Sequence, residues 1–178
     1  KKANQFWLIS SCGSKNGKLN QRHVNVIDAF YKKGHGIYMW GDNDPCNEEA
    51  NFVSTRVLDV SMSGDLPGDK VVTFKTKKNK SGLLRDHLIS TGIEMLYEGV
   101  TVASIKLNDA FKPFLWGSDG GVVAAFFDHD GKRAIVDGGM TRLYNKWDTA
   151  GTGRYVVNAA SWLANAERFK SIVKKPKK

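Results

Sequence analysis

Short apolar runs separated by amphipathic stretches dominate the first part of the chain. The runs predict buried strands, and they lie at residues 6–11, 37–40 and 71–74. Between the first two, apolar residues recur three or four apart from Val24 to Tyr31, and Gly34 follows as a helix-ending glycine. A second helix is predicted near Pro45, because proline suits the first helical turn and acidic residues follow it. This alternation is typical of an α/β domain.

The second half of the chain predicts a loop, more strands and a closing helix. Residues 61–69 are rich in Ser, Gly, Asp and Pro, and this composition predicts a loop. Residues 100–105 alternate like a strand. Two apolar runs, 121–127 and 133–136, flank Asp130-Gly131, which is a strong signal for a β-hairpin. The pattern predicts a three-layer α/β domain that ends in a C-terminal hairpin and a helix over residues 149–166.

Length and charge limit the domain organisation and the function classes. The 178 residues suffice for one domain, expected at residues 5–166, and no apolar run is long enough to span a bilayer. The net charge of +9 is concentrated in lysine clusters. Two of these clusters are Lys75, Lys77, Lys78 and Lys80, and Lys174, Lys175, Lys177 and Lys178. They indicate either a solvated loop and a disordered tail at 167–178, or contacts with phosphates or an acidic protein.

Cysteine usage and the basic tail bear on location. Cys12 and Cys46 alone do not make a disulfide framework, so a reducing compartment is expected. The cytoplasm is the predicted location. The Lys174–Lys178 tail also fits a short nuclear import signal.

Four segments resemble motifs of the class I glutamine amidotransferase-like superfamily. They are Phe30–Asp42, His87–Ile93, Gly131–Gly139 and Asn158–Leu163, in the family's order. The chain is most similar to the non-catalytic branch, which includes domains of intraflagellar transport components and of trehalose-utilisation-like proteins. The resemblance implies a flavodoxin-like fold with a mostly parallel central sheet.

The chain departs from that family where its catalysis takes place. Catalytic members carry a cysteine on a glycine-flanked elbow after the second strand, whereas this chain has Gly41-Asp42-Asn43-Asp44-Pro45. The family's late His-x-Glu pair is also missing from residues 138–144. Glutamine hydrolysis by the family mechanism is therefore not expected, and we predict a domain without enzymatic activity and without a cofactor.

Polar residues at the ends of two predicted strands form a candidate pocket edge. Ligands of open α/β sheets bind at the carboxyl ends of the strands. The residues of this edge are Asp42, Asn43, Asp44, Cys46 and Asp137. Asp42 and Asp44 with Asp137 could hold Mg²⁺ or Ca²⁺, although a capping role for Asp42 and Asn43 is preferred. Cys46 is interpreted as a structural cysteine at a helix terminus, since no histidine is spaced to activate it.

Aromatic residues in loop-like regions form a candidate interface. These are Trp116, Tyr144 and Trp147, with Arg142 among them. Aromatic residues and arginine are enriched at protein interfaces, but these side chains could equally fill the core beneath long loops. Gly138-Gly139 indicates either a close approach to an anion or a tight turn.

Three functions follow from the sequence. The preferred hypothesis is a catalytically degenerate amidotransferase-like domain that binds a protein partner, possibly acidic, or neighbouring domains of a larger protein. The first alternative is a metal-dependent hydrolase or carbohydrate-acting enzyme that uses Asp42, Asp44 and Asp137. The second is nucleic-acid binding through the lysine clusters, which is disfavoured because Phe74 is the only aromatic residue near the lysine loop.

Overall fold

A computed structural model describes residues 3–12, 19–144 and 150–166 of the chain. The α-helices of this part are α1 (Gln21–Lys32), α2 (Glu48–Val57) and α3 (Thr152–Leu163). The short 3-10 helices are η1 (Leu88–Ser90) and η2 (Met140–Leu143). The strands are β1 (Gln5–Ile9), β2 (Gly36–Trp40), β3 (Ser61–Pro67), β4 (Val71–Val72), β5 (Gly82–Leu83), β6 (Leu96–Tyr97), β7 (Thr101–Lys106), β8 (Lys112–Trp116), β9 (Val122–His129) and β10 (Lys132–Asp137).

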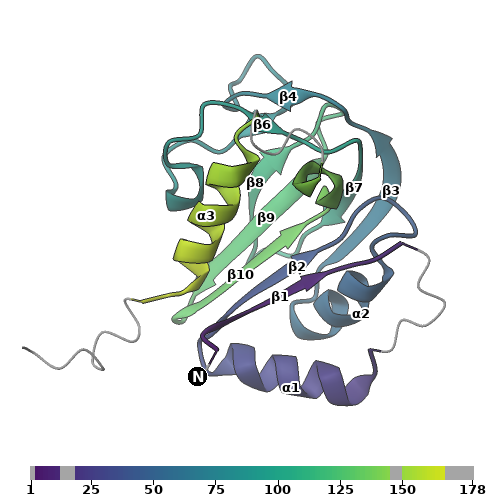
Figure 1. Cartoon of the computed structure of the whole chain (residues 1–178), viewed down its shortest axis with the longest axis vertical. Coiled ribbons are helices and arrows are strands. Elements are labelled where there is room, and N and C mark those ends of the chain that lie inside the picture. Colours follow the sequence, from purple (N-terminus) through teal and green to yellow (C-terminus); the bar gives the residue numbers. More distant parts are fainter. Residues whose placement is uncertain (1–2, 13–18, 145–149, 167–178) are drawn as a thin grey trace, which may run out of the picture.

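The central sheet has six strands in the order β1-β2-β10-β9-β8-β5 (Figure 1). β1, β2 and β10 run parallel, whereas β9, β8 and β5 pair antiparallel with their neighbours. The sheet is therefore mixed, and the prediction of a mostly parallel sheet is wrong for these strands. The reason is the C-terminal hairpin, because its two strands, β9 and β10, are neighbours in the middle of the sheet and antiparallel to each other. β8, a strand that the sequence pattern did not predict, also pairs antiparallel with β9.

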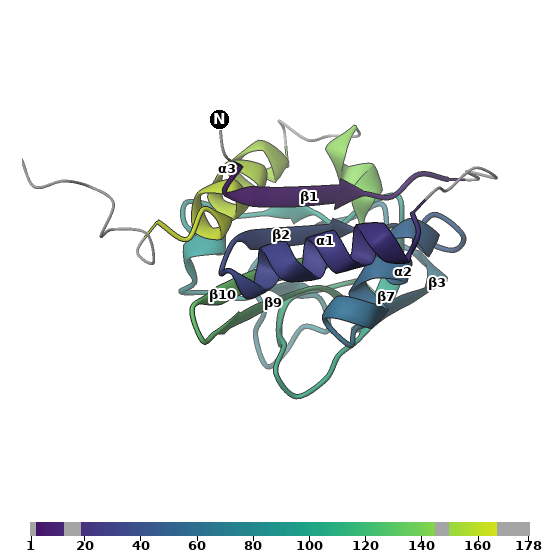
Figure 2. The ribbon, with the colours of Figure 1, turned by 90° about the horizontal axis from the view of Figure 1, so that it is seen from below.

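Helices cover both faces of the sheet (Figures 1 and 2). β2 lies inside the sheet with all five residues buried, and its side chains alternate between two cores. Tyr38 and Trp40 pack on the side of α3, whereas Ile37 and Met39 pack on the side of α1 and α2. A strand buried on both faces has no polar alternation, which explains the continuous apolar run in the sequence.

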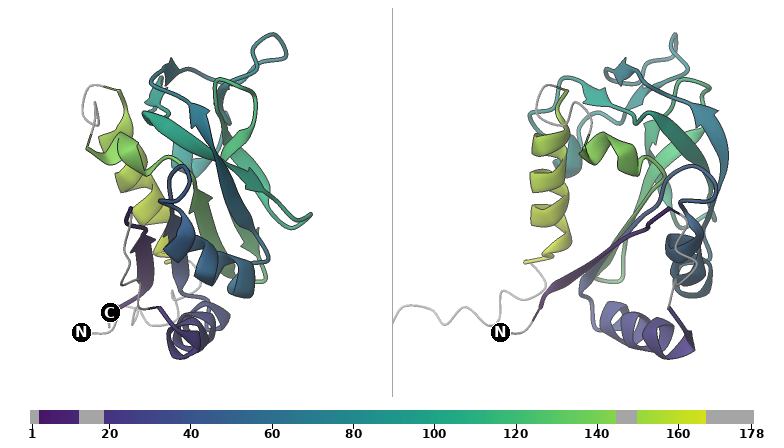
Figure 3. Two further views of the ribbon diagram at one scale, coloured as in Figure 1. Left: turned by 90° about the vertical axis from the view of Figure 1, so that its right-hand side faces the viewer. Right: turned by 45° about the vertical axis from the view of Figure 1, so that its right-hand side comes forward.

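The segment predicted as a loop at residues 61–69 contains a strand. β3 pairs antiparallel with β7 and forms a second, two-stranded sheet beside the main one (Figure 3). Its small polar residues lie on the outer side, while Met62 is buried. A register shift between Ser63 and Leu66 accommodates Gly64, which has a φ of 96°. Composition alone indicated a loop because one buried residue in this stretch was too weak a signal for a strand.

The hairpin predicted around Asp130-Gly131 is confirmed. β9 and β10 pair from Lys132↔His129 to Asp137↔Ala124. Asp130 and Gly131 have φ values of 51° and 65°, as a two-residue turn of this hairpin class requires. This hairpin carries Asp137 to the end of β10, beside the end of β2, where it enters the candidate site.

Candidate functional site

Asp137 is the centre of a buried polar cluster between the main sheet and α3. The hydroxyls of Tyr38 on β2 and Tyr155 on α3 lie 2.9 Å and 2.8 Å from its Oδ2. The two hydroxyls also lie 2.7 Å from each other. Two phenolic protons serve three short contacts, so the phenols share their protons between Asp137 and each other. The cluster joins β2, β10 and α3 at one point.

Arg142 completes the cluster from η2. Its Nη1 donates to Asp137 Oδ2 at 2.7 Å, and its Nη2 donates to the Glu98 carbonyl at 3.1 Å. Both side chains of the ion pair are fully buried. A buried charge is stable only when it is paired and hydrogen-bonded, so Asp137 and Arg142 depend on each other.

Gly138-Gly139 allows this approach. A Cβ on Gly139 would lie 2.3 Å from Arg142 Nη2 and 2.5 Å from the Glu98 carbonyl oxygen. A Cβ on Gly138 would lie 2.5 Å from the Ala103 carbonyl oxygen. The two glycines therefore serve the packing of the turn around Arg142, which was one of the two roles that the sequence left open.

The cluster keeps its phenols neutral and its arginine charged. Burial raises the pKa of Tyr38 and Tyr155 well above the ordinary value, and the negative charge of Asp137 raises them further. Burial opposes the charge on Arg142, but Asp137 outweighs it, so the pKa of Arg142 is raised. The tyrosines therefore act as hydrogen-bond donors to a carboxylate that balances the arginine.

Asp42 is a second buried carboxylate at the same edge. It is 1% exposed, and neither of its oxygens has a hydrogen-bond partner in the described part of the chain. Burial raises its pKa from 3.8 to about 7, and Asp137 adds to this rise. The charge of Arg142 and the nearby backbone amides of Asn43 and Thr141, which do not reach hydrogen-bonding geometry with the carboxylate, lower the pKa. Asp42 thus carries a proton near neutrality for part of the time.

The pocket-edge residues do not form one site. Asp42 and Asp137 both interact electrostatically with Arg142, whereas Asp44 faces α2 and β3. The Asp44 carboxylate accepts from Asn47 Nδ2 at 2.6 Å and from the Gly64 amide at 2.7 Å. Among the described residues, no group of three or more carboxylate, imidazole or thiol side chains could hold a metal ion. The geometry of these residues does not favour the metal-dependent alternative.

Asn43 and Cys46 also have structural partners. Thr101 donates to Asn43 Oδ1 at 2.9 Å, which ties the turn to β7. Cys46 forms a disulfide with Cys12. The disulfide agrees with the interpretation of Cys46 as a structural cysteine, whereas the expectation of a reducing compartment loses its basis. Cys12 follows β1 and Cys46 follows β2, and these parallel neighbours bring their carboxyl ends together.

We expect Cys12→Ser to lower the free energy of unfolding by on the order of 2 kcal/mol. The bond joins residues 34 positions apart and restricts the unfolded chain. Cys12 is exposed, so serine is tolerated at that position. Urea unfolding measures the change, and the wild type in reductant should match the variant. Equal stability of the oxidised and reduced wild type would contradict the prediction.

The candidate interface residues are dispersed. Arg142 is 0% exposed, so its assignment to an interface is wrong. Trp116 lies on β8 rather than in a loop and is half-buried, with Lys75 Nζ 5.8 Å from its ring centroid. Tyr144 is exposed at the end of η2. Trp147 lies outside the described residues, as does the tail at 167–178.

Two segments of the family resemblance contact each other. Asn158 Nδ2 on α3 donates to the carbonyls of Ile89 and Thr91 at 3.0 Å and 2.7 Å. His87 Nδ1 accepts from the Ile89 amide, and its ring packs 4.2 Å from the Phe126 ring centroid. Burial lowers the pKa of His87. These residues dock α3 and η1 on each other and on the sheet, which is a structural role.

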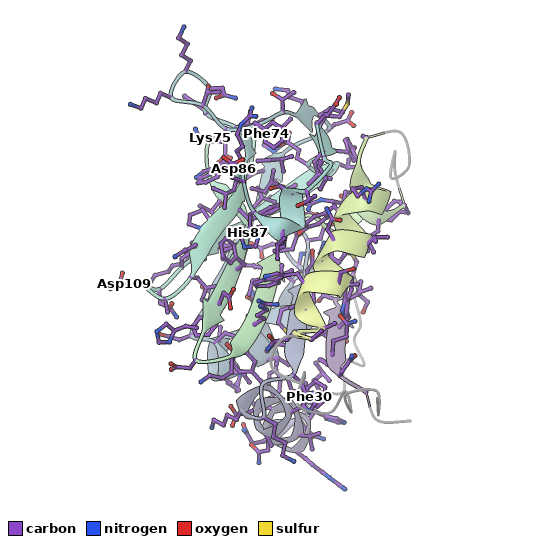
Figure 4. The ribbon with its side chains drawn as sticks, turned by 90° about the vertical axis from the view of Figure 1, so that its left-hand side faces the viewer. Phe30, Phe74, Lys75, Asp86, His87 and Asp109 are labelled. Carbon is purple, nitrogen blue, oxygen red and sulfur yellow. A yellow bond between two sulfur atoms is a disulfide. The ribbon has the colours of Figure 1, made fainter. Side chains whose placement is uncertain are left out.

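A large hollow lies elsewhere, between β1 and α1. It is an open groove of about 590 Å³ with a mainly apolar lining. Phe6, Leu19, Val26 and Phe30 contribute to that lining. Figure 4 shows Phe30 near one end of the molecule, while Phe74 and Lys75 of the lysine loop lie near the opposite end. The groove and the lysine loop are therefore separate surfaces.

Known proteins are similar to this chain in structure only. No family model matches the sequence, and no curated protein matches it. The chain shares its fold with the mmIFT52 N-terminal domain. That match has a TM-score of 0.65 at 13% identity and covers 90% of this chain and 76% of the other. A Salmonella typhimurium LT2 protein, Cytoplasmic Protein STM1381, matches with a TM-score of 0.56 at 13% identity, over 93% and 71% of the two chains.

A third solved structure extends the same picture. Cytoplasmic Protein STM3548 from Salmonella typhimurium matches with a TM-score of 0.53 at 11% identity, over 82% of this chain and 61% of the other. The similarity to the mmIFT52 N-terminal domain agrees with the expected relationship to intraflagellar transport domains, at the level of the fold. Within the described residues, no helix combines the length and apolar character needed to cross a membrane.

Proposed function

We propose that the chain is a catalytically degenerate amidotransferase-like domain, of flavodoxin-like three-layer design, that binds a protein partner or neighbouring domains of a larger protein. The observation that carries this proposal is the state of the former catalytic edge. Asn43 occupies the position of the elbow cysteine and accepts a hydrogen bond from Thr101. The preceding Asp42 is 1% exposed, and Asp137 is held by an arginine and two tyrosines. These contacts stabilise the fold.

The similarity to solved structures supports this proposal at the level of the fold. The match to the mmIFT52 N-terminal domain covers 90% of this chain, and that structure is an N-terminal domain. A partner-binding role within an assembly is consistent with that similarity. The open apolar groove between β1 and α1 supplies a surface on which such a partner could be bound. Location in the cytoplasm, or in the nucleus through the lysine tail, stays a prediction.

We expect no hydrolysis of glutamine or of simple esters by the purified chain. Among the pocket-edge residues, Cys46 is held in a disulfide and Asp42 is 1% exposed, so neither offers an accessible nucleophile. Ammonia release and ester absorbance measure the reaction. Steady turnover that Asp42→Ala abolishes would refute the absence of catalysis, provided that the variant keeps the circular dichroism spectrum of the wild type.

We expect the purified chain to form a complex of fixed stoichiometry with a purified partner. Candidates come from chemical cross-linking in native extract, and each is then expressed and mixed with the chain. Light scattering after size exclusion measures the mass of the complex. If every cross-linked candidate fails to bind when purified, while the chain remains folded, the binding function is wrong.

A further inference from the structure

Strand β1 leaves one side of the main sheet open. Among the described residues β1 pairs only with β2. The Ser10 amide donates to the Trp40 carbonyl at 2.7 Å. The backbone groups of alternate residues in a strand point to opposite sides. The backbone N–H and C=O groups of the even-numbered residues therefore face β2, and those of Gln5, Trp7 and Ile9 face away from it. β1 therefore offers a row of backbone donors and acceptors to another strand.

The groove lies directly against this open edge. Gln5 and Phe6 of β1 form one wall, and α1 forms the other. Val26 on α1, which lines the groove, is 63% exposed although it is apolar. A strand added to β1 would direct every second side chain to the α1 side of the sheet, where the groove could receive it. Backbone pairing and an apolar pocket thus occur together.

The charge around the groove indicates which class of partner would bind there. Arg22 lines the groove, no carboxylate residue lines it, and Arg22 has no ion pair among the described residues. The first turn of α1 contains no acidic residue, although a helix N-terminus attracts negative charge. The whole chain carries a net charge of +9. An acidic side chain of a partner would be stabilised near Arg22.

We propose that β1 and the groove bind an extended segment of a partner protein by strand addition, with apolar side chains in the groove and a carboxylate near Arg22. The inference rests on the protein-binding function proposed above and names the surface and the class of partner. A second copy of the chain fits less well, because pairing two β1 strands would bring two Arg22 side chains and two basic chains together.

The test uses synthetic peptides and the intact chain. The probe is a capped ten-residue peptide in which valine alternates with serine and two glutamates replace valines near one end, so that their carboxylates lie on the groove side of the added strand. Fluorescence anisotropy measures its affinity. We expect this peptide to bind about tenfold more tightly than the same peptide with lysine in place of glutamate. Amide exchange should become slower at Trp7 and Ile9, whose amides face outward, when the peptide is bound.

Paired variants separate strand addition from general charge attraction. Ile9→Pro removes an outward amide without removing a bond to β2, and Ile9→Ala is its control. Arg22→Glu reverses the charge at the groove, and Lys78→Glu applies the same reversal on the exposed lysine loop. We expect Ile9→Pro and Arg22→Glu each to weaken binding about tenfold. The two controls should bind like the wild type, and circular dichroism should show all four folded.

Each contrary result overturns the inference in a recognisable way. Absence of peptide binding at millimolar concentration, or equal losses in Arg22→Glu and Lys78→Glu, would reject the surface or its charge preference. Protection of Trp7 and Ile9 without peptide, together with a dimer in light scattering, would assign the edge to a second copy. If a purified partner binds Ile9→Pro and Arg22→Glu as well as wild type, protein binding stands and strand addition is wrong.

Discussion

Arg142→Met is expected to lower the free energy of unfolding by about 3–5 kcal/mol at neutral pH. The substitution removes the cation that forms an ion pair with Asp137 and leaves a fully buried carboxylate that interacts with Asp42. Methionine retains much of the side-chain length, so the change tests the charge more than the volume. Such a loss is a large part of the stability of a typical domain, about 5–15 kcal/mol. Urea unfolding at pH 7 measures it.

A double substitution distinguishes the unpaired charge from lost packing. Asp137→Asn combined with Arg142→Met removes both charges, so it should be more stable than Arg142→Met alone. Arg142→Lys retains the charge but cannot reproduce the two-pronged contact with Asp137 and the Glu98 carbonyl, so an intermediate loss is expected. Arg22→Met is the exposed control and should change stability by less than about 0.5 kcal/mol. Equal losses in Arg142→Met and the double variant would show that packing dominates.

Local patterns predicted the elements that are buried on regular faces. The continuous apolar run of β2 and the Asp130-Gly131 turn have direct physical causes, namely burial on both faces and a left-handed turn conformation. β3 was missed because its single buried Met62 stands among Ser, Gly and Asp, and its pairing with β7 is a long-range contact. Composition over nine residues contains no information on such a partner.

The sequence predicted where the candidate site lies but not which side chains contact each other there. The sequence predicted Asp42 and Asp137 at neighbouring strand ends, and in the structure both interact electrostatically with Arg142. Arg142 was assigned to an interface because aromatic residues and arginine are enriched there, and Tyr38 lay within the buried strand predicted at residues 37–40. The available signal was Gly138-Gly139 between Asp137 and Arg142, since two glycines there leave room for the guanidinium.

The disulfide was also within reach of the sequence. Cys12 and Cys46 each follow a predicted buried strand by a few residues. If the two strands are adjacent and parallel, their carboxyl ends meet, as β1 and β2 do. The missing step was the strand order, because neither periodicity nor composition specifies which strands are neighbours.

Asp42→Asn is expected to stabilise the protein above pH 7 and to have little effect near pH 4. The pKa of Asp42 is raised from 3.8 to about 7 in the folded state, chiefly by burial. The folded protein therefore holds this proton more tightly than the unfolded chain does, so stability falls as the pH rises from about 4 to about 7. A shift of this size corresponds to about 4 kcal/mol. Asparagine has no carboxylate to desolvate, so the variant should lose this pH dependence.

Urea unfolding at pH 4, 5.5, 7 and 8 measures the difference between the variant and the wild type. The difference should grow in favour of Asp42→Asn up to about pH 7 and then remain constant. Asp109→Asn, which removes an exposed carboxyl, controls for the loss of one negative charge. Arg142 and Asp137 also face Asp42, so the Asp42 contribution must be isolated as this difference and not from the wild-type curve alone. A difference that is the same at every pH would mean that Asp42 stays ionised in the folded protein, paired with Arg142 more strongly than its burial opposes.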